Sequence, residues 1–372
     1  MPVTVQKEGY GMSDTFGNTI RVTIYGESHG PEIGCVIEGL PAGLRVDETV
    51  IDRCLTMRRP SGAISTARVE TDPYVIGSGV SEGFTTGDTV RIAIPNQNTR
   101  SGDYSEMASV ARPSHADYAA FVKYHGENDV RGGGHFSGRI TAAVVAAGAV
   151  LLPALQAKGI RIGTHIAEIA GVKDREFGAG AELTKDLETL YTLDFAALDG
   201  AARAAMQEAI LAAKADADSV GGILETAVTG LPVGVGEPFF DSVEGLLAHA
   251  MFAIPGIKGI EFGAGFGLAK MRGSVANDPF RMDGGRVVTT SNNAGGINGG
   301  LTNGMPVIFR CAVRPTPTIG REQDTINFRE MKDATLAAKG RHDPCIVHRV
   351  RAVVDAMTAI VIADLLAGEG KL

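Results

Sequence analysis

The chain has 372 residues, 44% of them hydrophobic, which is enough for one large domain or for two to three ordinary ones. Its 35 basic and 43 acidic side chains give a net charge of −8, which argues against general affinity for nucleic acid or an anionic membrane. The four cysteines are scattered without a CxxC pair, so we expect reduced thiols in a cytoplasmic protein.

The first part of the chain predicts strands, turns and helices in a regular order. IRVTIY (20–25) predicts a strand that runs into the glycine-bracketed turn GESHG (26–30). The strand-like run 34–38 is followed by GLPAGL, by Asp47 as a candidate helix N-cap, and by a helix that ends before Pro60. The apolar run 140–155 contains Pro153 and is shorter than the about 20 residues that cross a bilayer, so it predicts a buried helix.

A similar order returns later in the chain. GLPVGV (230–235) follows another strand-like run, and Asp241 is the candidate N-cap of a helix that ends before Pro255–Gly256. GVSEGFTTGDTV (79–90) likewise resembles GINGGLTNGMPV (296–307). We interpret the chain as a single domain, 1–372, with duplicated halves at about 17–160 and 220–372 and an inserted connector at about 173–219. Chance recurrence of glycine-rich turns is the alternative.

Three segments carry candidate chemistry in the first half. His29 lies in the GESHG turn, whose glycines allow a ligand to approach the backbone. Arg112 and His115 flank a Pro-Ser turn, where Ser114 or His115 could also simply cap the following helix. RGGGHFSGR (131–139) precedes the apolar helix and is suited to bind a phosphate at the helix N-terminus, with Arg139 able to contact it.

A fourth segment, KGRHDPC (339–345), places Arg341, His342 and Asp343 together before a predicted helix that starts near Val347. A capping turn is the plain alternative for this segment. The G-x-S-x-G elbow of serine hydrolases fits GESHG only by letter, because strand-like sequence follows it. HExxH and cysteine clusters are absent from the sequence, so we expect no metal site.

Together, GNTIRVTIYGESHG, RPSHADY, RGGGHFSGR, SNNAGG, RPTPTI and GRHDPC resemble, in this order, the motifs of the chorismate synthase family. The resemblance implies an α/β (α+β) fold, a β-α-β sandwich with internal pseudo-symmetry, in a homotetramer. It implies trans-1,4 elimination of phosphate from 5-enolpyruvylshikimate 3-phosphate to give chorismate. It also implies a need for reduced FMN; since we see no clear nicotinamide site, we expect an external reductant to supply it.

The resemblance also implies roles for individual residues. His29 would protonate the leaving phosphate, His115 would protonate the reduced flavin, and Asp343 would help a flavin nitrogen to accept the substrate proton. The arginines implied around substrate and flavin are Arg58, Arg59, Arg112, Arg139 and Arg341. The implied flavin contacts are His135, Phe136, Ser137, Pro255, Gly256, Gly299, Arg314, Pro315, Thr316, Pro317, Thr318 and Arg341.

Two segments depart from the family pattern. The loop RRPSGAISTAR (58–68) lacks a basic residue just after the Pro-Ser-Gly turn, and HRVRAVV (348–354) brings an unexpected His348 and Arg351. Another flavin-dependent phosphate lyase on the same scaffold, or a phosphometabolite-binding protein without catalysis, therefore stays open as an alternative.

Overall fold

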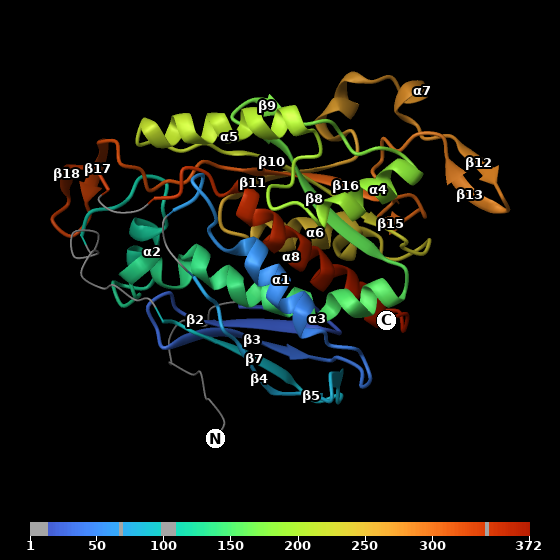
Figure 1. Cartoon of the computed structure of the whole chain (residues 1–372), viewed down its shortest axis with the longest axis horizontal. Helices are drawn as coiled ribbons and strands as arrows, with labels where there is room; N and C mark the ends of the chain where they lie inside the picture. Colours follow the sequence, from blue (N-terminus) through green and yellow to red (C-terminus); the bar gives the residue numbers. More distant parts are fainter. Residues whose placement is uncertain (1–13, 67–69, 98–108, 339–341) are drawn as a thin grey trace.

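The computed structural model describes residues 14–66, 70–97, 109–338 and 342–372 and combines helices with antiparallel sheets (Figure 1). The first sheet has five strands in the order β1-β2-β3-β7-β4, namely Thr15–Phe16, Arg21–Gly26, Glu32–Glu38, Val90–Pro95 and Val75–Ser78. The second has the order β11-β16-β10-β8-β9, namely Ile257–Phe262, Val307–Val313, Gly222–Thr229, Arg161–Ile169 and Val172–Lys173. The predicted mixture of helices and sheets is therefore confirmed.

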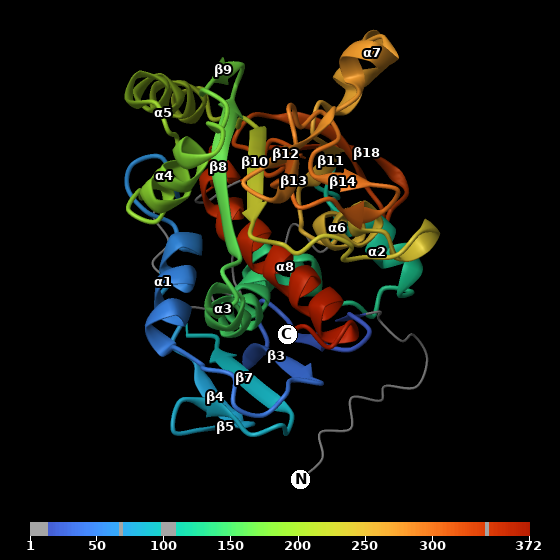
Figure 2. The same ribbon diagram turned by 90° about the vertical axis from the view of Figure 1, so that its right-hand side faces the viewer.

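Each sheet buries one face because apolar side chains alternate along its strands. In β7, Val90, Ile92 and Ile94 are buried, while the residues between them are half-buried. In β16, Val307 and Phe309 follow the same period of two. These faces are directed towards the helices that lie between the sheets, as Figure 2 shows for α1 (Glu48–Arg58), α3 (Thr141–Ala157) and α8 (Val347–Gly368).

The centre of the molecule is the contact between α3 and α8. Nearly all residues of α3 are buried, as the run of small apolar side chains predicts for a helix with neighbours on every side. A Cβ atom at Gly148 would lie 2.4 Å from Cα of Ala356, so only glycine allows the two helices to approach this closely. In the described part of the chain, one helix, Gly138–Ala157, has the length and composition of a membrane span, and most of it is buried inside this core.

The helices α1 and α6 (Val243–Phe252) follow the two GLP turns. Asp47 caps α1 as predicted, since its carboxylate accepts a hydrogen bond from the Thr49 N–H. The prediction of Asp241 as the cap of α6 is wrong: Ser242 accepts the hydrogen bond from the Gly245 N–H. Asp241 instead belongs to η5 (Phe239–Asp241), one residue too early for its side chain to cap the helix.

The connector between the halves packs against the second sheet. Its helices are α4 (Ala181–Leu190) and α5 (Gly200–Ala215). α5 is amphipathic, with Met206 and Ile210 buried on one side. Leu187 of α4 lies against Gly163 of β8, where a Cβ atom would come within 2.7 Å of its side chain. α4 therefore covers part of the sheet outside the main core.

The remaining elements lie at the two ends of the molecule. α2 (Asp117–Lys123) and the hairpin of β17 (Gln323–Asn327) and β18 (Lys332–Leu336) lie at one end, and α7 (Gly273–Ala276) with the hairpin of β12 (Phe280–Asp283) and β13 (Arg286–Thr289) at the other (Figure 1). Two further hairpins, β5–β6 (Val80–Ser81, Phe84–Thr85) and β14–β15 (Ile297–Asn298, Leu301–Thr302), precede β7 and β16. Three 3₁₀ segments complete the list: η3 (Arg131–Phe136), η4 (Gly138–Ile140) and η6 (Gly265–Lys270).

Candidate active site

The triglycine loop, Gly132–Gly134, brings together two histidines that are far apart in the sequence. All three glycines have positive φ, of 60°, 86° and 54°, which side chains rarely tolerate. A Cβ atom at Gly132 would lie 2.7 Å from Cδ2 of His29, and one at Gly133 would lie 3.5 Å from Nε2 of His115. The bare backbone is therefore what allows both imidazoles to lie along one loop, just before α3 begins.

His115 is oriented by a carboxylate. Its Nδ1 lies 2.6 Å from Oδ1 of Asp117 and 3.1 Å from Nη2 of Arg112. Nε2, on the other side of the ring, faces Gly133. Neither Ser114 nor His115 caps α2, whose first turn has no side-chain cap. Asp117, at the start of that helix, contacts the imidazole of His115 instead.

Arg112 is engaged by the same carboxylate. Its Nε and Nη2 donate to the two oxygens of Asp117 at 2.8 and 2.7 Å, and both side chains are buried. Burial would raise the pKa of Asp117, but the hydrogen bonds from Arg112 and His115 outweigh it and hold the pKa far below its usual range. The predicted site arginine Arg112 therefore lies beside His115, with much of its hydrogen-bonding capacity directed to Asp117.

The turn that carries His29 is held by Asn96, which follows β7. The Asn96 side-chain amide donates to the carbonyls of Glu27 and Gly30 at 2.9 Å each. Its Oδ1 accepts a hydrogen bond from Nε of Arg139 at 3.1 Å. One asparagine thus connects the His29 turn to the arginine at the start of α3.

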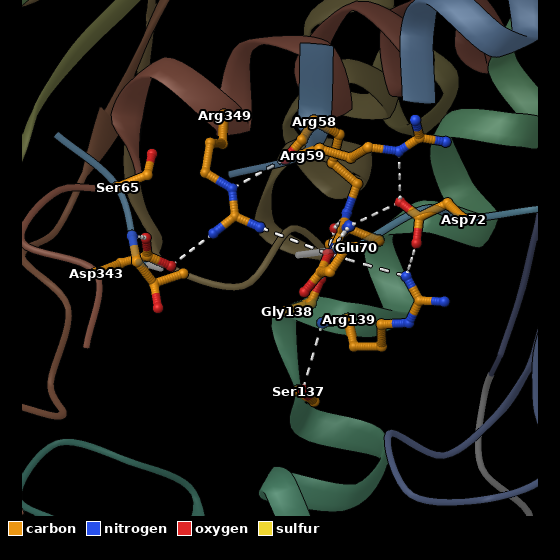
Figure 3. A network of polar contacts seen from close by, with 12 residues as sticks. Arg58, Arg59, Ser65, Glu70, Asp72, Ser137, Gly138, Arg139, Asp343 and Arg349 are labelled. Atoms are coloured by element: carbon orange, nitrogen blue, oxygen red, sulfur yellow. Dashed lines mark hydrogen bonds and ion pairs between the residues drawn. The ribbon is translucent and has the colours of Figure 1, made fainter. Parts of the chain in front are cut away.

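A network of arginines and carboxylates surrounds the N-terminal ends of α3 and α8 (Figure 3). We define it as Arg58, Arg59, Glu70, Asp72, Arg139, Asp343 and Arg349. Glu70 accepts from Nη1 of Arg58 at 2.6 Å and lies 3.9 Å from Arg139 and 3.8 Å from Arg349. Asp72 pairs with Arg139, and it lies 3.5 Å from Nε of Arg59. Predicted site residues from both ends of the chain therefore meet here.

The arginines decide the charge state of Glu70. Burial is the largest influence and would raise its pKa, but Arg58, Arg349 and Arg139 together lower the pKa to about 2. Glu70 is therefore ionised at neutral pH and balances part of the positive charge. The network is consequently a mixed cluster rather than a bare positive surface.

The arginines of the network differ in what they have left to donate. Arg58 is buried, and its three guanidinium nitrogens donate to the Thr141 hydroxyl, to Glu70 and to the Gly138 carbonyl. Arg349 donates to the Arg58 carbonyl and to Asp343, and its Nη2 lies 3.8 Å from Glu70. Among the described residues, Arg59 donates through Nε alone, and Arg139 donates through Nε and Nη1. Arg341, the remaining predicted arginine, lies outside the described residues.

Asp343 joins the network to the predicted cofactor segments. Its oxygens accept from the Thr66 N–H at 2.8 Å and from Arg349 at 2.5 Å. The next residue, Pro344, accepts from the Val220 N–H, and Ser219 beside it donates to the Thr316 carbonyl. The Arg314 N–H in turn donates to the Gly256 carbonyl at 2.9 Å. Segments 255–256, 314–316 and 343–346 therefore converge near the start of α8.

Other predicted flavin contacts are placed differently. Both ring nitrogens of His135 are engaged, by the Gly26 carbonyl and by Asp14, and the hydrogen bond to Asp14 raises its pKa. The Ser137 hydroxyl accepts from the Arg139 N–H, and Phe136 is exposed. Gly299 lies in the β14–β15 turn beside Gly300, which contacts the start of α6 at Val243. Gly299 therefore lies near the N-terminal end of α6, whereas Pro255 follows its C-terminal end.

Several residues of the site escaped the sequence reasoning. Glu70 and Asp72 are central to the network and Asn96 contacts it, yet none of them lies in a segment that we had singled out; Arg349 lies in HRVRAVV, where we had singled out only its neighbours His348 and Arg351. The acidic pair Glu70 and Asp72 follows the loop that departs from the family pattern, and that loop begins with Arg58 and Arg59. Two carboxylates so soon after two arginines were the available sign of an ion-pair network. Arg349 lies in the first turn of α8, six residues after Asp343.

The two departures from the family pattern contact each other. His348 is buried and its Nε2 lies 2.8 Å from the Ser65 hydroxyl, while burial lowers its pKa to about 3. Arg351 is buried and donates to the Leu193 carbonyl of the connector. Lys214 of α5 donates to the Ala63 carbonyl. The altered loop is thus held by the altered segment and by the connector.

The comparisons with known proteins agree with the motifs. Residues 20–367 match the family model described as chorismate synthase. A chorismate synthase of Dehalococcoides mccartyi is 46% identical over 359 residues, which cover 95% of this chain and 96% of that protein. One from Korarchaeum cryptofilum is 43% identical over 94% of this chain and 96% of its own length. A crystal structure of chorismate synthase, 28% identical, has a TM-score of 0.75 and covers 95% of this chain and 93% of its own.

Proposed function

Because this chain belongs to the chorismate synthase family, we propose that the triglycine loop and the adjoining arginine network form its active site. The enzyme is a carbon–oxygen lyase, and its reaction is the trans-1,4 elimination of phosphate from 5-enolpyruvylshikimate 3-phosphate to give chorismate. The single observation that carries the site assignment is the convergence of His29 and His115 on consecutive glycines of one loop, directly before the arginines at α3.

Charge supports this assignment. The substrate bears one phosphate and two carboxylates, and Arg59 and Arg139 each keep guanidinium donors that no described residue occupies. The N-termini of α3 and α8 add partial positive charge at the same place. Arg58 and Arg349 donate to protein groups through Nε and Nη1, and Arg58 also through Nη2, so they stabilise the positions of the neighbouring Arg59 and Arg139.

We assign proton transfer to the histidines. His29 acts as the acid that protonates the leaving phosphate oxygen, from its place against Gly132. His115 holds one proton at Nδ1 against Asp117 and moves the other at Nε2, the nitrogen that faces Gly133. Asp343, with both oxygens engaged, serves as a fixed negative charge beside the cofactor segments.

The residues present fit reduced FMN as the cofactor. The Thr316 hydroxyl is buried and has no hydrogen-bond partner among the described residues, as a donor reserved for a ligand would be. Burial lowers the pKa of the neighbouring Arg314, and no carboxylate in the described part of the chain pairs with it. We therefore assign segments 255–256 and 314–318 to the flavin. When bound, it supplies the electron-rich ring that stabilises developing charge on the substrate. An external reductant would keep it reduced.

We also propose that the chain is one domain built from two duplicated halves. The strand orders β2-β3-β7-β4 and β8-β10-β16-β11 of the two sheets correspond position by position. In each half, a GLP turn, a helix, a short hairpin and a core helix follow one another in the same order along the chain. A homotetramer is our further proposal, in which Gly299, at the opposite end of α6 from Pro255 in its own subunit, serves a neighbouring site. The four buried free thiols favour a cytoplasmic location.

The experiment is anaerobic turnover of 5-enolpyruvylshikimate 3-phosphate with chemically reduced FMN, followed by chorismate absorbance. We expect turnover by the wild type, and about 10²- to 10⁴-fold lower kcat for His29→Ala and for His115→Ala, as for removal of a general acid. Asp117→Asn should lower kcat as well, because it changes the partner of His115. Full activity in both histidine variants would exclude the assigned site, and sedimentation analysis checks the tetramer.

A further inference from the structure

Asp72 occupies an unusual position in the network. Its side chain is fully buried, and its backbone has a φ of 45°, in the left-handed region that few residues other than glycine, asparagine and aspartate adopt. Its carboxylate faces three arginines: it pairs with Arg139 and lies 3.4 Å from Arg58 and 3.5 Å from Arg59. A strained backbone and a buried charge are thus maintained at a single residue.

The arginines on either side of Asp72 keep their outer edges open. Arg59 contacts Asp72 through Nε, and neither of its Nη atoms has a hydrogen-bond partner within the described residues. Arg139 uses Nη1 for Asp72 and Nε for Asn96, which leaves Nη2. In the view of Figure 3, the Asp72 carboxylate lies between the two guanidinium groups.

The open edges are tied to the catalytic turn. Asn96 accepts from Arg139 and donates to the two carbonyls that bracket His29. Asn96 therefore links Arg139, and any anion that Arg139 binds, to the turn that carries His29. The side chains of Arg59 and Arg139 are 25% and 10% exposed, so a ligand can reach both, whereas Asp72 is inaccessible to it.

We propose that Asp72 is a positioning residue that aligns Arg59 and Arg139 into one two-armed receptor for an anionic group of the substrate. The proposal rests on the proposed function for the identity of that substrate, but not for the anion site itself. Asp72 does not touch the ligand. Its charge holds two like-charged guanidinium groups side by side, which would otherwise repel each other. Guanidinium groups bind both phosphate and carboxylate through paired hydrogen bonds, so either group of the substrate fits this receptor.

The test uses two variants that keep the backbone. Asparagine tolerates positive φ, and glycine adopts it without strain, so Asp72→Asn and Asp72→Gly remove the carboxylate without forcing the chain to rearrange. We expect each to raise KM for 5-enolpyruvylshikimate 3-phosphate by about 10- to 100-fold, with a much smaller change in kcat. In an Arg139→Gln background, Asp72→Asn should have little further effect on KM.

A binding measurement separates this proposal from the proposed function. Titration calorimetry with inorganic phosphate, and separately with shikimate as a carboxylate, requires no turnover and no cofactor. Weakened binding of either anion in the Asp72 variants supports the proposal, and the anion affected identifies the group that is received. If the wild type failed to turn over but bound phosphate in this manner, the proposed function would fail while the inference would stand.

Asp186→Asn is the matched control. Asp186 is also buried and also pairs with an arginine, Arg175, but it lies in α4 of the connector. It should lower Tm without changing KM or anion affinity. The proposal is overturned if the Asp72 variants lose Tm in the same way while KM and the affinities for both anions stay at wild-type values, or if those affinities increase.

Discussion

The two GLP turns and the helices that follow them share a local structure but differ in what the helices deliver. In the first, the Thr85 hydroxyl accepts from the Leu44 N–H at 2.9 Å and donates to the Pro41 carbonyl at 2.6 Å. In the second, Thr302 makes the corresponding contacts to Val235 and Pro232 at 2.9 and 2.6 Å. Both threonines are buried and come from the short hairpin that precedes the next long strand.

The difference lies at the far ends of the helices. α1 ends in Arg58 and Arg59, which enter the arginine–carboxylate network. α6 ends in Phe252, which is half exposed, and leads to Pro255–Gly256, which contribute backbone only. The two turns therefore position their helices in the same way. The residues at the C-terminal end of each helix decide whether it contributes charged side chains, as α1 does, or backbone groups, as the segment after α6 does.

The largest expected effect comes from breaking the charged end. Arg58→Ala leaves Glu70 and the Gly138 carbonyl without their main partner, and such loss from a buried pair costs about 3–5 kcal/mol of unfolding free energy. Phe252→Ala, at the matching end of α6, should cost under about 1 kcal/mol because the ring is half exposed. Urea unfolding of both variants measures the difference; equal losses would contradict the comparison.

Acid should lower the free energy of unfolding through the charged end of α1, which has no counterpart at the end of α6. The pKa of Glu70 is lowered from 4.5 to about 2, and a shift of that size corresponds to about 3 kcal/mol. Because the folded-state pKa lies below the unfolded one, this stabilisation is complete above about pH 4.5 and is lost as pH falls towards 2. Glu70→Gln should therefore flatten the stability curve between these pH values. If the free energy of unfolding fell equally in the variant and the wild type over this pH range, Glu70 would not contribute to acid sensitivity.

The shared threonine contacts should matter equally in both units. Thr85→Val and Thr302→Val keep the shape but remove a buried hydroxyl that serves one donor and one acceptor, at a cost of about 1–3 kcal/mol each. Thermal unfolding should show losses of similar size. A large loss at only one threonine would mean that the two turns are not energetically equivalent.

The smallest effect distinguishes the helix caps. Ser242→Ala should cost about 1 kcal/mol at any pH, since a hydroxyl does not titrate in this range. The pKa of Asp47 is lowered, chiefly by its hydrogen bond with the Thr49 hydroxyl, so its cap is lost as pH falls through the folded-state pKa. The destabilisation by Asp47→Ala should therefore shrink in acid while that by Ser242→Ala persists. Parallel melting curves at neutral and acid pH test this.

Local sequence patterns were sufficient for much of the fold. The alternating strands β7 and β16, the buried helix α3 and the cap at Asp47 follow from periodicity and side-chain chemistry within a few residues. The cap of α6 was misplaced by one residue, because aspartate and serine are adjacent and both are good caps. The pattern could not decide which of the two has the required backbone conformation.

The site divides in the same way. The sequence by itself determined the family, the two histidines, and the glycines that the triglycine loop needs, because these depend on residue type and order. Only the tertiary structure decided which arginines have nitrogens left to bind a ligand: all three nitrogens of Arg58 donate, to Thr141, Glu70 and Gly138, whereas Arg59 donates to the described residues through Nε alone. Hydrogen bonds between residues 80 or more positions apart depend on how α1 and α3 pack, and that packing is a property of the whole chain.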